Sequence, residues 1–280
     1  MKDREEIAQA LAASGYIADA ELATAISLMQ RLRRPLLLEG EAGVGKTEVA
    51  KALASVHATE LIRLQCYEGL DQSTALYEWN YQRQLLAIEA HRGHADGIED
   101  RIFSEKYLLE RPLLASIRRE KPPVLLIDEI DRADDEFEAF LLEFLSDFAV
   151  TIPELGTIAA DRRPAVVLTS NRTRELHDAL KRRCLYHWID YPAPERERAI
   201  VRARIPGVPA EIAAKVVAAV SRLRDHGDLY KLPGVGETLV WARALLALGD
   251  GASLDETLGA ALKVHEDVLR VRERKVLEGV

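Results

Sequence analysis

One octapeptide, Gly40-Glu41-Ala42-Gly43-Val44-Gly45-Lys46-Thr47, constrains this chain more than any other feature of its sequence. It matches the pattern G-x-x-x-x-G-K-[ST] and lies between an apolar run, Pro35 to Leu38, and a helical pattern, Thr47 to Val56. A strand, a glycine loop and a helix in this order surround a phosphate with backbone N–H groups at a helix N-terminus, whereas an ordinary glycine-rich turn lacks these neighbours. Lys46 would neutralise the β- and γ-phosphates of a nucleotide, and Thr47 would offer Mg²⁺ a hydroxyl. The residues expected to contact the nucleotide are Glu41, Ala42, Gly43, Val44, Gly45, Lys46, Thr47 and Glu48.

Two adjacent carboxylates follow a second apolar run. Val124 to Ile127 predicts a buried strand, and Asp128 and Glu129 come directly after it. In α/β folds, ligands bind at the carboxyl ends of the strands, so these acids are expected beside the phosphates. Asp128 would hold Mg²⁺ through its water shell, and Glu129 would act as the general base that polarises the attacking water. An isolated Asp-Glu pair is more often a surface turn, but the strand and the glycine loop favour catalysis.

A third strand and a basic cluster complete the set of candidate residues. Val166 to Leu168 predicts a strand that leads to Asn171, whose amide would hydrogen-bond the γ-phosphate or the attacking water, unless it only forms a turn. Arg182 and Arg183 follow a helical stretch, and nothing local gives them an acidic partner in their own site. Because guanidinium groups stabilise charge on a transferred phosphoryl group, Arg183, and as second choice Arg182, is expected to act across a subunit boundary. A solvated basic helix end is the alternative.

The overall pattern predicts an α/β fold, a P-loop core with a parallel sheet between helices, followed by a smaller all-helical lid domain. Weaker strand signals at Leu61 to Leu64 and Trp188 to Ile189 complete the sheet, and two helical stretches precede the first strand. After Tyr191 the strand signals stop, and helical patterns alternate with glycine and proline breaks. We therefore predict a nucleotide-binding core over 1–191 and a helical lid over 192–280.

Composition narrows the classes of function. The net charge of −8 disfavours broad attraction to nucleic acid, so no nucleic-acid partner is expected. The apolar runs are too short for a transmembrane segment and the first residues lack an apolar signal core, which predicts a cytoplasmic protein. Cys66 and Cys184 stand apart without metal-ligand spacing, so both are expected to be buried thiols.

These elements occur in the order and approximate spacing of Walker A, Walker B, sensor 1 and arginine finger in the AAA+ ATPases, which the whole core resembles. The run Leu-Leu-Ile-Asp-Glu-Ile-Asp-Arg-Ala at 125–133 resembles the MoxR family, as does 61–66. More narrowly, 64–71 and 169–175 are similar to the CoxD-type branch, which is associated with maturation of molybdenum-containing carbon monoxide dehydrogenase and related hydroxylases.

The resemblance implies a homo-oligomeric, hexameric ring that binds ATP and Mg²⁺ between subunits and remodels a client protein, often with a partner that carries a von Willebrand factor A domain. It also implies a helical insertion at Tyr77 to Asp100 and a hairpin at Phe148 to Arg163 as candidate client contacts. Tyr16 and Ile17 stand where such proteins place adenine contacts, although both could equally be core residues.

One feature departs from the MoxR pattern. These relatives usually carry a sensor 2 arginine at the start of a lid helix, but this chain has Gly234-Val235-Gly236-Glu237 there, and the nearest arginine is Arg243. Arg243 lies about two turns into that helix, where an ordinary exposed arginine is as good an interpretation.

The leading hypothesis is therefore an ATPase, a ring-forming motor or chaperone for a metalloenzyme client. The alternatives are a nucleotide-dependent assembly scaffold with little turnover, which Glu129 argues against, and a nucleic-acid motor, which the acidic charge disfavours. A simple P-loop kinase is the weakest, because it needs neither Asn171 nor the helical C-terminal part.

Overall fold

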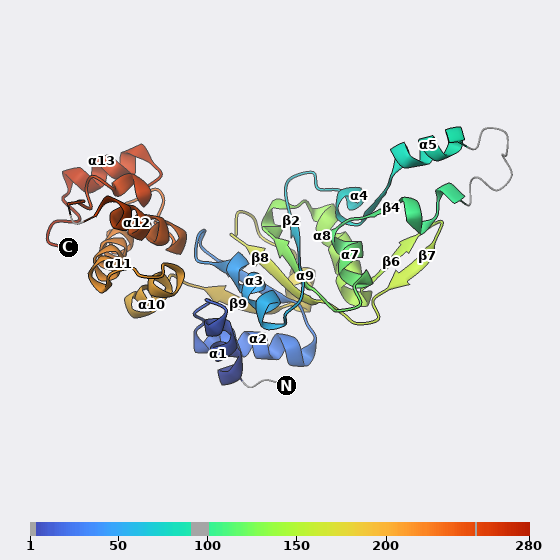
Figure 1. Ribbon diagram of the computed structural model, residues 1–280, viewed down its shortest axis with the longest axis horizontal. Helices are drawn as coiled ribbons and strands as arrows, with labels where there is room; N and C mark the ends of the chain where they lie inside the picture. The colour runs from blue at the N-terminus through green and yellow to red at the C-terminus, as the bar shows by residue number, and fades with distance from the viewer. Residues whose placement is uncertain (1–3, 91–100, 250) are drawn as a thin grey trace. The chain divides into compact units, whose positions relative to one another are not determined.

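Every apolar run that predicts a strand forms one in the computed structural model, which describes residues 4–90, 101–249 and 251–280 (Figure 1). Contacts group the described residues into two units, which we treat separately. The first contains Thr24–Glu39 and the described residues of Leu53–His187, and the second contains residues 4–23, Gly40–Ala52 and the described residues of Trp188–Val280. The domain boundary between residues 191 and 192 stays a prediction.

The centre of the fold is a five-stranded sheet in the order β2-β5-β8-β1-β9. Strand β5 pairs in parallel with β2 on one side and with β8 on the other, and β8 pairs in parallel with β1. The carboxyl ends of these four strands therefore lie at one edge of the sheet, and their amino ends at the opposite edge. The bounds are β1 (Leu36–Gly40), β2 (Leu61–Gln65), β5 (Val124–Asp128), β8 (Ala165–Ser170) and β9 (Leu185–Ile189).

The central strands are buried on both faces, which explains their continuous apolar runs. All five residues of β5 are buried, and so are all five of β1. Alternate side chains of β5, Leu125 and Ile127, join a cluster with α7 (Pro112–Arg118) and α8 (Asp135–Asp147). Helix α7 begins with proline at its first position, where the missing N–H costs nothing.

Smaller elements flank the sheet in the first unit. The hairpin predicted within Phe148 to Arg163, before β8, is confirmed, because β6 (Ala149–Ile152) pairs antiparallel with β7 (Gly156–Ala159). The described part of the predicted insertion contains β3 (Tyr77–Trp79) and α5 (Tyr81–Ala90), and its residues 91–100 lie outside the described residues. The remaining elements are α4 (Gln72–Ala75), β4 (Leu108–Glu110), the short helices η1 (Glu105–Tyr107) and η2 (Ile130–Arg132), and α9 (Asp178–Arg183).

The C-terminal part of the second unit is helical, as predicted. Helices α10 (Pro194–Arg204), α11 (Ala210–Asp225), α12 (Val235–Leu248) and α13 (His265–Glu273), with η3 (Leu258–Ala260), enclose a core that includes the fully buried Trp241. The two helices expected before the first strand are α1 (Arg4–Ala13) and α2 (Ala20–Leu32), and α3 (Lys46–Val56) follows the glycine loop. Within the described ranges, no helix combines the length and apolar character needed to cross a membrane.

Candidate nucleotide-binding site

The glycine loop folds around its own lysine. Helix α3 begins at Lys46, so the loop lies at a helix N-terminus as the motif requires. The Lys46 ammonium is buried and donates hydrogen bonds to the carbonyl oxygens of Gly40 and Glu41, at 2.7 and 2.8 Å. Gly43 and Gly45 adopt φ of +80° and +99°, a left-handed region that residues with a Cβ rarely enter. The loop thus has the backbone form of a phosphate cradle with a cation inside it.

The first glycine of the motif is required by packing as well. A Cβ atom on Gly40 would lie 2.3 Å from the carbonyl oxygen of Ile189, at the end of β9. Because that neighbour is backbone, no side-chain rotation relieves the clash. Gly40 therefore allows the chain to leave β1 and turn into the loop.

The lid helix α12 contacts the glycine loop through backbone atoms. The amide of Val235 donates to the carbonyl oxygen of Gly43 at 3.0 Å, and Gly234, the N-cap of α12, lies against Gly43. The Glu237 carboxylate accepts a hydrogen bond from the Gly234 amide at 3.0 Å, which fixes the start of the helix. The position expected for a sensor 2 arginine is therefore taken by a glycine and a capping glutamate, and Arg243 is exposed further along α12.

Asp128 is held from two sides at the end of β5. It is 2% exposed, and its Oδ1 accepts a hydrogen bond from the Thr169 hydroxyl at 2.5 Å. Its Oδ2 accepts two from the Arg63 guanidinium of β2, at 2.9 and 2.6 Å. Because two charge-assisted bonds and a hydroxyl fix the carboxylate, Asp128 is oriented before any ligand arrives.

Glu129 follows in a strained conformation. Its φ of 56° is in the left-handed region, where residues other than glycine are uncommon and often functional. The Gln65 amide donates to one carboxylate oxygen at 3.0 Å and the Asn171 amide to the other at 3.4 Å, while the Glu129 N–H donates to Thr169 Oγ1 at 2.9 Å. The structure thus brings together Asp128, Glu129 and Asn171, as the sequence predicts.

The two candidate finger arginines end helix α9. Both side chains are exposed, and within the described residues neither guanidinium forms an ion pair with a carboxylate. Their backbone carbonyls are engaged instead, because the Arg34 guanidinium donates to the oxygen of Arg183 at 3.0 Å and to that of Arg182. The helix end is thereby fixed while both side chains are exposed.

Tyr16 and Ile17 lie in a segment fastened to α10. Arg196 donates to the Ile17 carbonyl at 3.1 Å and pairs with Asp19 at 2.5 Å. Burial raises the pKa of Tyr16 to about 12, against the opposing charge of Arg196. These contacts fit a structural role and leave the adenine contact a prediction.

Glu48 has partners of its own. Burial would raise the pKa of Glu48, but hydrogen bonds from Lys51 and Arg204 outweigh it and lower that pKa. Its carboxylate is therefore ionised and already paired near neutral pH, and its contact with a nucleotide stays a prediction.

Both cysteines are buried thiols. Cys66 and Cys184 are 1% and 8% exposed, and burial raises the pKa of each to about 12, helped at Cys66 by Asp128 and neighbouring acids. A thiol with such a pKa is a poor nucleophile and a poor metal ligand. Among the described residues, no group of three or more His, Cys, Asp and Glu side chains forms a metal site.

A comparison with known families settles the class of the protein. The profile of the ATPase family associated with various cellular activities (AAA) matches residues 36–189, more than half of the chain. The chain belongs to this AAA family. The match begins at β1 and ends at β9, so it spans the sheet, the glycine loop and the strand ends described above.

Curated relatives of this AAA protein include Clp proteins. It is 32% identical over 149 residues to chaperone protein ClpB 2 of Parasynechococcus marenigrum, covering 51% of this chain and 14% of the relative. It is 31% identical over 162 residues to chaperone protein ClpB of Tropheryma whipplei, covering 57% of this chain and 20% of the relative. It is 29% identical over 153 residues to the ATP-binding subunit ClpC of Staphylococcus epidermidis, covering 52% of this chain and 16% of the relative. The AAA protein thus spans a fifth or less of the length of these relatives.

Solved structures agree on the fold. A Cytophaga hutchinsonii protein solved as a candidate ATPase superposes with a TM-score of 0.52 at 16% identity, covering 78% of this chain and 63% of the other. A point mutant of RuvB from Thermotoga maritima superposes with a TM-score of 0.50 at 16% identity, covering 98% of this chain and 71% of the other. At this identity the likeness concerns the fold, an α/β P-loop core with a helical C-terminal part, which confirms the predicted fold class.

Several residues of the site escape sequence reasoning. Arg63, Gln65 and Thr169 hold the two carboxylates, and Gly234 contacts the loop. All four lie in stretches compared with the MoxR family, but the sequence predicted no role in the site for any of them. A signal existed for Arg63 and Gln65, because they are the polar residues of an otherwise apolar strand next to β5.

Proposed function

We propose that this chain is a Mg²⁺-dependent ATPase whose general base is Glu129. The observation that supports this most is the Glu129 carboxylate itself, held in a left-handed conformation between two donor amides at the carboxyl ends of β2, β5 and β8. Strand β1 runs parallel to β8 and continues into the glycine loop, which supports a shared role of loop and carboxylates at that edge of the sheet.

The loop would bind the phosphates. Lys46 would exchange its bonds to the Gly40 and Glu41 carbonyls for phosphate oxygens, and the backbone amides at the start of α3 would donate to the same group. This exchange needs no large movement, because the ammonium is already inside the loop.

The donor set also fits Mg²⁺. Thr47 offers a hydroxyl and Asp128 a fixed carboxylate, which are the hard oxygen ligands that Mg²⁺ takes when phosphates and water complete its shell. When bound, Mg²⁺ would offset negative charge on the phosphates. The residues expected to hold it are Thr47 and Asp128.

Hydrolysis would then depend on proton transfer to Glu129. A water beside the γ-phosphate would lose its proton to a Glu129 oxygen as its own oxygen attacks phosphorus and the bond to the β-phosphate breaks. Gln65 and Asn171 would keep the carboxylate aimed by donating to its two oxygens, and Asn171 is also close enough to the base to position the water.

Arg183 would complete the site of a neighbouring subunit. Its side chain is exposed at a fixed helix end, and within the described residues it has no carboxylate partner. Both properties suit an arginine finger that acts on the site of another subunit. Arg182 is the second choice. This proposal requires a homo-oligomer, for which a hexameric ring is the expected form.

For the biological role we propose a chaperone or maturation factor for a metalloenzyme client. The support is the resemblance of 125–133, 64–71 and 169–175 to the MoxR family and its CoxD-type branch, together with the similarity of the AAA region to chaperone proteins ClpB. A partner with a von Willebrand factor A domain belongs to the same proposal.

The first test is steady-state ATP hydrolysis measured against protein concentration, beside light scattering with and without ATP and Mg²⁺. Specific activity that rises together with particle mass supports a shared site. Full activity in a monomer would contradict the finger in trans, and assembly without turnover would replace the ATPase by a nucleotide-dependent scaffold.

A further inference from the structure

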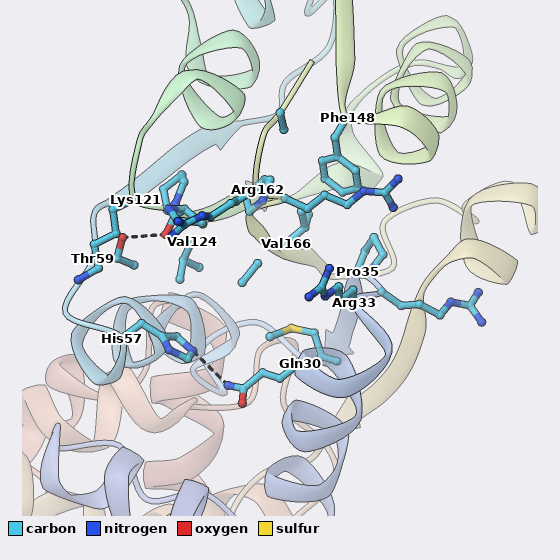
Figure 2. A pocket seen from close by; sticks show the side chains of 18 of the residues that line it. Gln30, Arg33, Pro35, His57, Thr59, Lys121, Val124, Phe148, Arg162 and Val166 are labelled. Carbon is cyan, nitrogen blue, oxygen red and sulfur yellow. Dashed lines mark hydrogen bonds between the residues drawn. The ribbon is translucent and has the colours of Figure 1, made fainter. Parts of the chain in front are cut away.

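A pocket opens at the edge of the sheet where three of its strands begin. It has a volume of about 650 Å³ and lies where β1, β5 and β8 begin, beside Pro35, Val124 and Ala165 (Figure 2). Its position at the amino ends of the strands separates it from Asp128 and Glu129, which stand at the carboxyl ends. The pocket therefore includes neither the two carboxylates nor the residues that hold them.

The pocket is strongly basic although the chain is acidic. Of the described residues that line it, five are arginine or lysine, and Asp161 is the only carboxylate. The basic residues are Arg33, Arg34, Lys121, Arg162 and Arg163. In a chain with a net charge of −8, such a local excess of positive charge calls for a physical explanation.

Two of the five basic residues bind backbone carbonyl groups near helix ends. Lys121 donates to the Ala58 carbonyl at 2.5 Å, just after α3, and Arg34 donates to the two carbonyls at the end of α9. Cations at helix C-termini offset the negative end of the helix dipole. Arg34 and Lys121 thus have structural work that accounts for their presence.

The remaining three arginines have no such role. Arg163 lies over the ring of Phe148, with 5.1 Å from its guanidinium carbon to the ring centroid. Arg33 and Arg162 are exposed, and in the described ranges no ion pair joins any of the three to a carboxylate. Arg33 comes directly after α2, Arg162 and Arg163 lie in the loop before β8, and all three line the same pocket.

The lining between these charges is apolar. Met29, Pro123, Val124, Phe148 and Val166 line the pocket and are buried. Figure 2 labels Val124, Phe148 and Val166 among them. Two lining residues, Arg33 and Phe148, have φ of 50° and 51°, a strained conformation for side chains of this size. An apolar pocket of several hundred cubic ångströms with converging donors has the form of a ligand site.

We propose that this pocket binds an acidic peptide segment, with carboxylates on Arg33, Arg162 and Arg163 and an apolar side chain between them. Guanidinium groups pair with carboxylates in a planar, two-bond geometry, and clusters of arginine are a common means of recognising acidic motifs. A peptide uses both the charged rim and the apolar interior. A bare phosphate would use only the rim, and a nucleic acid would need a longer basic track than this single pocket.

The test is fluorescence anisotropy with a labelled octapeptide that combines glutamate and leucine, titrated with the full chain without nucleotide. The wild type is expected to bind it at least about tenfold more tightly than a peptide with glutamine in place of glutamate, and less tightly as salt rises. The pocket variant Arg33→Asn with Arg162→Gln is expected to lose at least about tenfold in affinity. Asparagine keeps the left-handed backbone at position 33.

A matched control removes the same charge elsewhere. Arg31 and Arg202 are exposed and do not line the pocket, so Arg31→Gln with Arg202→Gln should bind the acidic peptide like the wild type. Equal affinity for both peptides, or an equal loss in both double variants, would overturn the proposal. So would displacement of the peptide by inorganic phosphate or a single-stranded oligonucleotide at lower concentration than by unlabelled peptide. If the pocket variant does not fold, the two-peptide comparison on the wild type still decides the question.

Discussion

Gly43 of the glycine loop and Gly234 at the N-cap of α12 meet backbone to backbone. A Cβ atom on Gly234 would lie 2.9 Å from the Gly43 Cα and 3.0 Å from the Ala42 carbonyl oxygen. The hydrogen bond from Val235 to the Gly43 carbonyl follows from this approach. The start of the lid helix is thereby tied directly to the loop that is expected to hold the phosphates, without a sensor arginine between them.

Gly234→Ala is therefore expected to weaken nucleotide binding. Because the opposing atoms are backbone, the loop or the helix must shift, which should lower ATP affinity several-fold and the free energy of unfolding by about 1–3 kcal/mol. Isothermal titration with ATP and a thermal melt measure the two effects. The control is Gly236→Ala in the same helix, where an added Cβ meets nothing within 4 Å and alanine should stabilise by roughly 0.5–1 kcal/mol. Unchanged ATP affinity in Gly234→Ala would show that the contact does not shape the loop.

Glu129→Gln should separate binding from chemistry. An amide cannot accept the proton of the attacking water, so ATP turnover is expected to fall about 100-fold or more while ATP still binds. Phosphate release and nucleotide titration measure these separately. Glu143→Gln, an exposed change of the same kind on α8, serves as the control and should behave like the wild type. Turnover near the wild-type rate would remove Glu129 from the mechanism.

Arg63→Met tests how the buried Asp128 is held. The change removes the two Arg63 donors to Oδ2 of a carboxylate that is 2% exposed, and the loss of hydrogen bonds to a buried charged group costs about 1–3 kcal/mol. We therefore expect Arg63→Met to lower the melting temperature more than the loss of an exposed ion pair does. The control is Arg198→Met, which breaks an exposed pair with Glu195 and should cost less than about 1 kcal/mol. Equal effects of the two variants would contradict a supporting role for Arg63.

The sequence was most informative where burial leaves one solution. Strands β1 and β5 are buried on both faces, so they must be continuous apolar runs, and the motif residues at their ends could be read directly. Strand β9 gave a weaker signal because its residues are mostly half-exposed, and only its last two residues were predicted. The support for the carboxylates could not be predicted, because it depends on the register that sets Gln65 opposite Asp128. The contact of Gly234 with Gly43 likewise depends on the folded backbone alone.

The two thiols should be almost inert in the folded protein. With a pKa of about 12, roughly one thiol in ten thousand is ionised at pH 8, against about one in ten at the ordinary value of 9. A chromogenic disulfide reagent is expected to label Cys66 and Cys184 slowly in buffer and both rapidly in denaturant. Because folding raises the pKa of each thiol, the protonated thiols stabilise the folded state relative to the unfolded one. This stabilisation is fully present below pH 9, the ordinary pKa, and is lost as pH rises through about 12. Rapid labelling of either thiol in the folded protein at pH 8 would contradict its burial.

Arg183→Ala tests the finger and its action in trans together. Loss of the guanidinium should reduce turnover by about 1000-fold or more, and Arg182→Ala should have a smaller effect if Arg183 is the finger. Arg34 bonds to backbone carbonyls of both residues, so neither change should disturb the end of α9. The decisive measurement mixes Arg183→Ala with Lys46→Ala, two variants that are each expected to be inactive. The second keeps Arg183 and can complete the intact loop of the first, so the mixture should regain part of the activity, and a mixture that stays inactive would mean that Arg183 does not act across a subunit boundary.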